Sequence, residues 1–186
     1  MPVRNRVSRF YVLGLILTVW PLLLGRGSGA AGWLDVPFVP QVKAGCGSAA
    51  VAMVIEYWAY RYPSLQYAAE DTAEIDRLLP ASRRGIRGEA LRRYLDRCGF
   101  RAFVFDGELA DLEHHFEKGR PVIVCFAPKG PHAPLHYAVI VGVDARNVWM
   151  NDSARGKLIR EDTSRFLEEW KVTANWALLA VPRQVQ

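Results

Sequence analysis

Residues 36–58 read VPFVPQVKAGCGSAAVAMVIEYW, and this stretch decides the fold. Its first half carries two prolines, which permit an extended edge segment over 33–41 and forbid a helix there. After a loop at 42–45 the pattern changes, because apolar side chains recur every three or four residues from Cys46 until Pro63 ends the run. The sequence therefore predicts a helix that begins at Cys46.

The position of Cys46 gives its side chain a chemical interest. A cysteine at the N-terminus of a helix feels the partial positive charge of the unpaired N–H groups, which favours the thiolate over the thiol. Cys46 is thereby a candidate nucleophile, and the neighbouring Gly45 and Gly47 leave room for a substrate backbone to approach the sulfur. The alternative is a buried cysteine that only packs at the start of the helix.

A nucleophilic cysteine needs a base, and four histidines compete for that role. His114 and His115 are adjacent in a short charged segment, DLEHHFEKG, where we expect them to be solvated, and His132 lies in a proline-rich loop. His136 alone opens an apolar strand, HYAVIVGV, on which an imidazole can be held rigidly. We predict that His136 faces Cys46 across a cleft between two lobes, against the alternative of a structural histidine.

A third group must accept the other ring N–H of the histidine and so orient it. Asp152 follows the return strand of the hairpin that His136 opens, whereas its rival Asp144 lies in the turn at the far end of that hairpin. We predict Asp152 as the orienting residue. The alternative is that Asn151-Asp152-Ser153 is a turn that only caps the strand.

Gln41 is the fourth candidate, five residues before Cys46 and on the other side of the loop. From there its side-chain N–H can be donated to an oxyanion that forms at the sulfur. The alternative is a solvated glutamine in a loop.

The rest of the chain contains mainly helices first and strands afterwards. Helices are predicted at 64–79, 88–98, 108–118 and 163–170, and strands at 101–105, 122–126, 137–143, 148–151, 157–160 and 176–181. No internal repeat, low-complexity tract or long linker follows residue 32. We therefore predict one α+β domain over 33–186, with an N-terminal helical lobe and a C-terminal antiparallel sheet.

Three motifs together resemble a known family: the stretch at 36–58, HYAVIVGVD from His136, and VWMNDSARG around Asp152. They resemble the bacteriocin-processing cysteine peptidases, family thirty-nine of the cysteine class, over roughly residues 34–181. The resemblance implies a papain-like two-lobed fold and hydrolysis of peptide bonds. It assigns the nucleophile to Cys46, the base to His136, the orienting group to Asp152 and the oxyanion donor to Gln41.

Two features depart from the pattern of that family. Ser48 stands where many relatives have proline after Cys-Gly, and the chain carries no ATP-binding cassette such as the exporters that cut double-glycine leaders in the cytoplasm have. We expect a stand-alone domain that acts on a peptide or protein substrate, with separate export machinery as a further partner. Two other functions stay open: amide hydrolysis or acyl transfer on a cell-wall or small-molecule substrate, and a non-catalytic peptide-binding module.

The net charge of +5 belongs to the N-terminal segment. Four arginines and no acidic residue lie in the first thirty residues, whereas the two signs nearly balance in the rest, so no nucleic acid is expected as a partner. Three of these arginines precede the apolar run Phe10–Leu24, and small residues follow at Ser28-Gly29-Ala30. This pattern predicts that residues 1–30 are a cleaved signal peptide or a membrane anchor, and that the domain is periplasmic, extracellular or held at the membrane.

The three cysteines are an odd number, so at least one thiol is left over if disulfides form. Cys98 and Cys125 fall on a predicted helix face and in an apolar strand, where we expect buried thiols, or else a disulfide between the two in an oxidising compartment. Neither a Cys-x-x-Cys pair, nor two histidines four residues apart on a predicted helix, nor a phosphate-binding glycine loop occurs. No metal and no cofactor are therefore expected.

Overall fold

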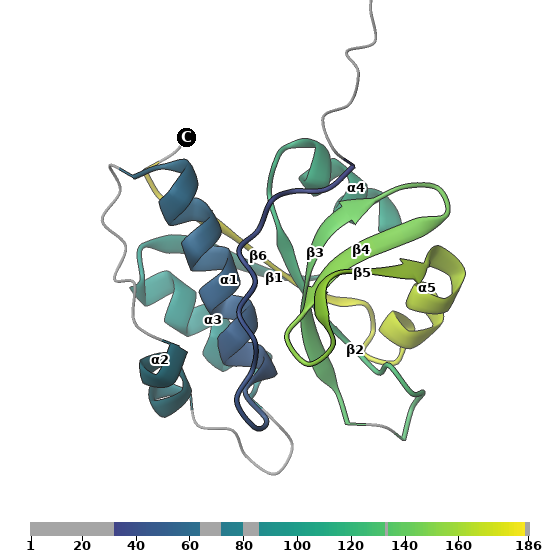
Figure 1. The fold of residues 1–186 in the computed structure, drawn as a ribbon, viewed down its shortest axis with the longest axis horizontal. Coiled ribbons are helices and arrows are strands. Elements are labelled where there is room, and N and C mark those ends of the chain that lie inside the picture. Colours follow the sequence, from purple (N-terminus) through teal and green to yellow (C-terminus); the bar gives the residue numbers. More distant parts are fainter. Residues whose placement is uncertain (1–31, 64–71, 80–85, 133, 185–186) are drawn as a thin grey trace, which may run out of the picture.

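The computed structural model describes residues 32–63, 72–79, 86–132 and 134–184 (Figure 1). Its helices are α1 (Cys46–Arg61), α2 (Thr72–Leu78), α3 (Gly88–Arg97), α4 (Leu109–Glu117) and α5 (Thr163–Lys171). Its strands are β1 (Phe100–Asp106), β2 (Val122–Phe126), β3 (His136–Val143), β4 (Asn147–Asp152), β5 (Gly156–Asp162) and β6 (Trp176–Pro182). Helices packed on an antiparallel sheet confirm the predicted α+β class.

The helix α1 begins at Cys46, as predicted, and ends at Arg61 shortly before Pro63. Every residue from Cys46 to Ile55 is buried, so the helix is enclosed on nearly all sides rather than along one apolar face. This enclosure fixes the direction of the helix, and with it the position of its first residue.

The strands form one antiparallel sheet in the order β1-β6-β2-β3-β4-β5. β1 follows the first three helices in sequence, yet it pairs with the C-terminal strand β6, from Phe100 opposite Pro182 to Asp106 opposite Trp176. β6 also pairs with β2, so the last strand of the chain lies inside the sheet. The C-terminal strand therefore ties the helical lobe to the rest of the sheet.

Two apolar clusters lie on opposite faces of this sheet. On β3, Tyr137, Val139 and Val141 belong to the cluster that includes α1 and α3. The alternate residues Ala138 and Ile140 belong to the cluster that includes α5. Because side chains alternate along a strand, β3 is buried on both faces and forms a rigid support for its first residue.

The segment before α1 is extended, as predicted for 33–41, and runs between the helices and the strands (Figure 1). The amide nitrogen of Gln41 donates to the carbonyl oxygen of Ser153 at 3.1 Å, and Nδ2 of Asn151 donates to the carbonyl oxygen of Val36 at 3.0 Å. These separate bonds replace a strand ladder, because the prolines of the segment have no N–H to donate.

Most predicted elements occur within two residues of their expected bounds. Of the helix predicted at 64–79, the structure describes the part from Thr72 to Leu78, and 64–71 lie outside the described residues. The predicted export segment, 1–30, also lies outside them. Within the described ranges, no helix has the length and apolar character needed to cross a membrane.

Candidate active site

Cys46 is the first residue of α1, and its side chain is only 8% exposed. The backbone N–H groups of Gly47 and Tyr137 face its sulfur, and so does the ring of His136. Burial by itself would raise the pKa of the Cys46 thiol. The hydrogen bond and the positive charge from His136, with the two backbone N–H groups, outweigh burial and lower that pKa below its ordinary value.

His136 is the first residue of β3, and its side chain is 13% exposed. Nε2 of its ring lies 2.7 Å from Oδ1 of Asp152, which leaves Nδ1 as the ring nitrogen for Cys46. The ring of Phe126 lies edge-on beside the imidazole, with 5.7 Å between the ring centroids. The imidazole is thus held from two sides, by an acceptor and by an apolar surface.

Asp152 is the last residue of β4, and it is fully buried. β3 and β4 are antiparallel with Val139 opposite Asn151, so Asp152 and His136 are diagonal neighbours on one face of the sheet. Oδ1 of Asp152 also accepts from the backbone N–H groups of Ala154 at 2.9 Å and of Arg155 at 3.2 Å. These bonds fix the carboxylate where it meets the imidazole.

The electrostatics of these three groups are coupled. Burial would lower the pKa of His136, but its hydrogen bonds to Asp152 and Cys46 and their negative charges outweigh burial and raise the pKa to about 9. Burial would raise the pKa of Asp152, but the hydrogen bond and the charge of His136 lower it. Between the lowered pKa of Cys46 and the pKa of about 9 of His136, the site therefore favours a thiolate beside an imidazolium, with the Asp152 carboxylate behind the imidazolium. This arrangement is an activated nucleophile beside an acid.

Gln41 joins the loop before α1 to the turn after β4. Its Nε2 donates to the carbonyl oxygen of Lys43 at 2.7 Å, and its Oε1 accepts from Oγ of Ser153 at 3.0 Å. The side chain is half-buried, and its two hydrogen bonds hold it in place. An amide NH₂ carries two hydrogens, and Lys43 takes one of them, so the other is available to a ligand.

The glycines beside Cys46 have a packing role in addition to the one that the sequence indicates. A Cβ at Gly45 would lie 2.8 Å from Oδ1 of Asp76, and one at Gly47 would lie 3.2 Å from the side chain of Leu91. These two contacts come from α2 and α3. The glycines therefore allow the helices of the lobe to pack closely around the start of α1.

Tyr137 is a site residue that sequence reasoning missed. Its backbone N–H faces the sulfur of Cys46, and its hydroxyl donates to the carbonyl oxygen of Ile86 at 3.0 Å, which ties β3 to the segment before α3. Ser153, which holds Gln41, was missed as well. Their signal in the sequence is adjacency, since each directly follows one of the predicted site residues, His136 and Asp152.

The rival residues lie elsewhere. Asp144 caps the turn between β3 and β4, where its Oδ1 accepts from the backbone N–H groups of Arg146 and Asn147. His114 is exposed, as expected, but His115 is half-buried and packs edge-on against Phe105. The expectation that His115 is solvated is therefore wrong, and burial lowers its pKa.

The other two cysteines are buried, as expected, and do not form a disulfide with each other. Burial, together with the nearby Cys46, raises the pKa of the Cys125 thiol to about 12. Of the residues that the structure describes, no three or more His, Cys, Asp or Glu gather as they would around a metal ion.

The architecture is shared with solved peptidase domains. The chain matches a double glycine motif protease from an AMS/PCAT transporter, in complex with the leader peptide, with a TM-score of 0.62 and 21% identity over 81% of this chain and 94% of that chain. It matches the peptidase domain of Streptococcus ComA with a TM-score of 0.62 and 23% identity over 78% of this chain and 98% of that domain. The chain also matches a protein described as a C39-like peptidase from Bacillus anthracis, with a TM-score of 0.62 and 16% identity over 82% of this chain and 99% of that chain. The fold is thus that of cysteine peptidase domains.

The family follows from a comparison with family models. The model described as Peptidase C39 like family matches residues 33–178, so the chain belongs to the Peptidase C39-like family. A comparison with curated proteins finds no match. The resemblance seen in the sequence is confirmed at the level of this family, and the narrower relation to peptidases that process double-glycine leaders stays a prediction.

Proposed function

We propose that this chain is a cysteine peptidase that hydrolyses peptide bonds with Cys46 as nucleophile and His136 as acid and base. One observation carries the proposal: His136 contacts Cys46 on one side and Asp152 on the other, and all three side chains are largely buried. Nε2 of His136 lies 2.7 Å from Oδ1 of Asp152. The lowered pKa of Cys46 and the raised pKa of His136 both favour the pair of thiolate and imidazolium over the pair of thiol and neutral imidazole.

In the first half of the reaction, the thiolate of Cys46 attacks the carbonyl carbon of the scissile peptide and forms a tetrahedral oxyanion. The imidazolium of His136 gives a proton to the leaving nitrogen, the C–N bond breaks, and a thioester remains on Cys46. In the second half, neutral His136 takes a proton from water, the hydroxide attacks the thioester, and the thiolate leaves. Asp152 keeps the ring oriented throughout both halves.

The oxyanion needs donors that are aimed at it before the reaction begins. The second N–H of the Gln41 side chain is one donor in this proposal, since its position is fixed by Lys43 and Ser153. The backbone N–H groups of Gly47 and Tyr137 also face the sulfur of Cys46. Donors of this kind stabilise charge that appears only in the transition state.

A peptide or protein is the proposed substrate class. The solved double glycine motif protease was captured with a leader peptide, and its fold is the fold of this chain. For the location we propose export or membrane anchoring, because three arginines precede the apolar run Phe10–Leu24. Fractionation of expressing cells tests the location: the full-length chain in the soluble cytoplasm would contradict it.

Peptide-library profiling of the purified full-length chain tests the activity. The wild-type chain should cut a subset of peptides, and Cys46→Ala should cut none, whereas Cys125→Ala, a buried cysteine with a raised pKa, is the matched control and should retain activity. Release of ammonia or transfer of an acyl group without peptide cleavage would favour the amidase or acyltransferase alternative. Binding of peptides with no covalent reaction at Cys46 would favour a binding module.

A further inference from the structure

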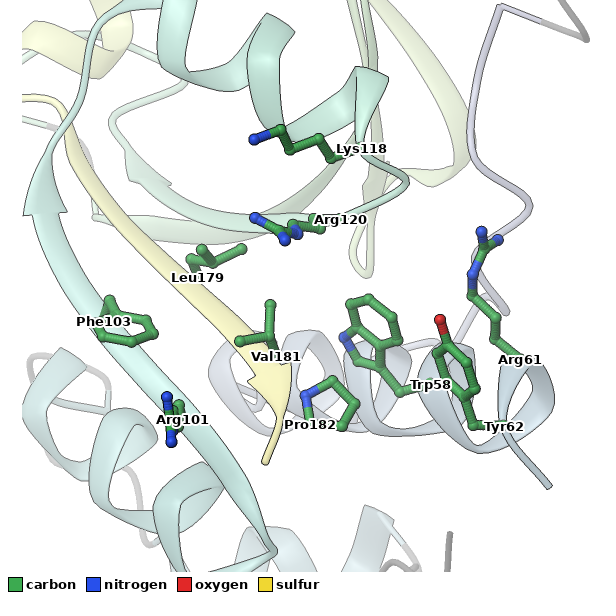
Figure 2. A pocket seen from close by; sticks show the side chains of 10 residues that line it. All are labelled: Trp58, Arg61, Tyr62, Arg101, Phe103, Lys118, Arg120, Leu179, Val181 and Pro182. Atoms are coloured by element: carbon green, nitrogen blue, oxygen red, sulfur yellow. The ribbon is translucent and has the colours of Figure 1, made fainter. Parts of the chain in front are cut away.

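A second cavity lies at the opposite end of α1 from Cys46. It has a volume of about 480 Å³ and is walled by the last turn of α1, by β1 and β6, and by the turn after α4 (Figure 2). Arg61 is the fifteenth residue after Cys46 on the helix, which corresponds to about 22 Å along the axis. The cavity is therefore separate from the candidate active site.

Four cations line this cavity: Arg61 from α1, Arg101 from β1, and Lys118 and Arg120 from the turn after α4. None of the ten described residues that line it is acidic. No ion pair within the described residues involves Arg61, Lys118 or Arg120. A concave site lined by charges of one sign concentrates the electrostatic potential and attracts the opposite charge.

The fold brings these cations together by a specific contact. The hydroxyl of Tyr57, on α1, donates to the carbonyl oxygen of Gly119 at 2.8 Å, and Gly119 stands between Lys118 and Arg120. Gly119 has a φ of +66°, a conformation that favours glycine, and the guanidinium of Arg61 lies beside it. This partly buried hydrogen bond thus holds Arg61, Lys118 and Arg120 close together at the edge of the cavity.

Aromatic and apolar side chains also line the cavity. The indole of Trp58 is fixed by a hydrogen bond from Nε1 to the carbonyl oxygen of Ala180 at 3.0 Å. The ring of Tyr62 stacks on it, with 5.9 Å between centroids and 15° between planes. Phe103 is half exposed on the neighbouring strand. A ligand in this cavity meets Lys118 and Arg120 on one side and the rings of Trp58 and Tyr62 on the other (Figure 2). Arg61 lies beside Tyr62, and Arg101 lies beside Phe103 on β1 (Figure 2).

We propose that this cavity binds the phosphate groups of an organic phosphate. A phosphate monoester carries a charge of about −1.5 to −2 at neutral pH, so one or two phosphates match four cations, whereas a carboxylate carries a single charge. Guanidinium groups also bind phosphate with two parallel hydrogen bonds. The volume exceeds what inorganic phosphate needs, and the apolar wall accommodates an organic body. This site does not depend on the peptidase activity.

Calorimetric titration of the full-length chain with pyrophosphate and with ATP tests the proposal, and flotation with phosphatidylglycerol vesicles separates a lipid headgroup from a soluble source. The test variant is Lys118→Gln/Arg120→Gln. The matched control is Arg93→Gln/Lys171→Gln, which removes the same two charges from exposed positions outside the cavity. Both variants retain residues 1–30, so vesicle binding by that segment affects them equally.

One soluble phosphate compound, or the anionic vesicles, should bind at low salt and release at high salt. The test variant should weaken binding by on the order of 10-fold for each cation removed, and the control by less than about 2-fold. Arg61→Gln, on a different element, repeats the test if melting curves show that the double variant is destabilised. Three results would each overturn the proposal. The chain could bind neither the soluble phosphate compounds nor the vesicles, all variants could bind them equally well, or the chain could bind a polyglutamate peptide more tightly than phosphate.

Discussion

Asp152→Asn should lower the pKa of His136 by roughly one unit, and this change isolates what the carboxylate does. Asparagine keeps an oxygen near the position of Oδ1, 2.7 Å from Nε2 of His136, but removes the negative charge. A hydrogen bond to a charged group contributes about 1.5–3 kcal/mol, and a neutral one about 0.5–1.5 kcal/mol. The difference of about 1–2 kcal/mol corresponds to roughly one pKa unit.

The sign follows from the direction of the shift. Asp152 stabilises the imidazolium and so raises the pKa of His136, to about 9 in the intact site. Loss of that charge brings the deprotonation of His136 closer to neutral pH. The supply of imidazolium for the leaving nitrogen then ends at a lower pH, so the alkaline limb of any pH–rate profile should move down as well.

Carbon-13 NMR of labelled histidine, followed from pH 5 to pH 10, measures this pKa without a substrate. Asp144→Asn is the matched control, because Asp144 is the rival acid of the same hairpin and binds only the turn. It should leave the His136 midpoint unchanged. An unchanged midpoint in Asp152→Asn, in a chain with a native circular dichroism spectrum, would refute the assignment of Asp152 as the group that orients and charges His136.

Three further predictions concern reactivity, rate and packing. Iodoacetamide at mildly acidic pH should modify Cys46 much faster than Cys125, whose pKa is about 12, as read by mass spectrometry; equal rates would contradict the ion pair. Gln41→Ala should lower turnover by on the order of 10²-fold to 10³-fold and stability by about 1 kcal/mol, because two side-chain hydrogen bonds are lost; unchanged turnover on a good peptide would remove it from the site. Gly88→Ala should destabilise the domain by about 1–3 kcal/mol, since its Cβ would lie 2.4 Å from the ring of Trp176, and an unchanged melting temperature would contradict this packing.

The sequence by itself determined the local elements and the candidate residues. Prolines before Cys46 and after the helix bound α1, and the β-branched run after His136 predicts β3, because these signals act within a few residues. The choice of Asp152 over Asp144 also came from local reasoning, since the two ends of a hairpin are set by its turn. Local reasoning did not predict the packing around Gly45 and Gly47, because their neighbours come from other helices. Nor did it predict the burial of His115, which packs against Phe105.

Tertiary structure decided everything that depends on distant segments meeting. The pairing of β1 with β6, the anchoring of Gln41 by Ser153, and the approach of Cys46 to His136 join residues far apart in the chain. Such contacts depend on the packing of whole elements, which no local pattern encodes. The pKa shifts of Cys46 and His136 also depend on tertiary structure, because the two residues are buried next to charged neighbours only in the folded domain. The cationic cavity also depends on tertiary structure, since the ends of α1 and α4 and the strands β1 and β6 all contribute residues to it.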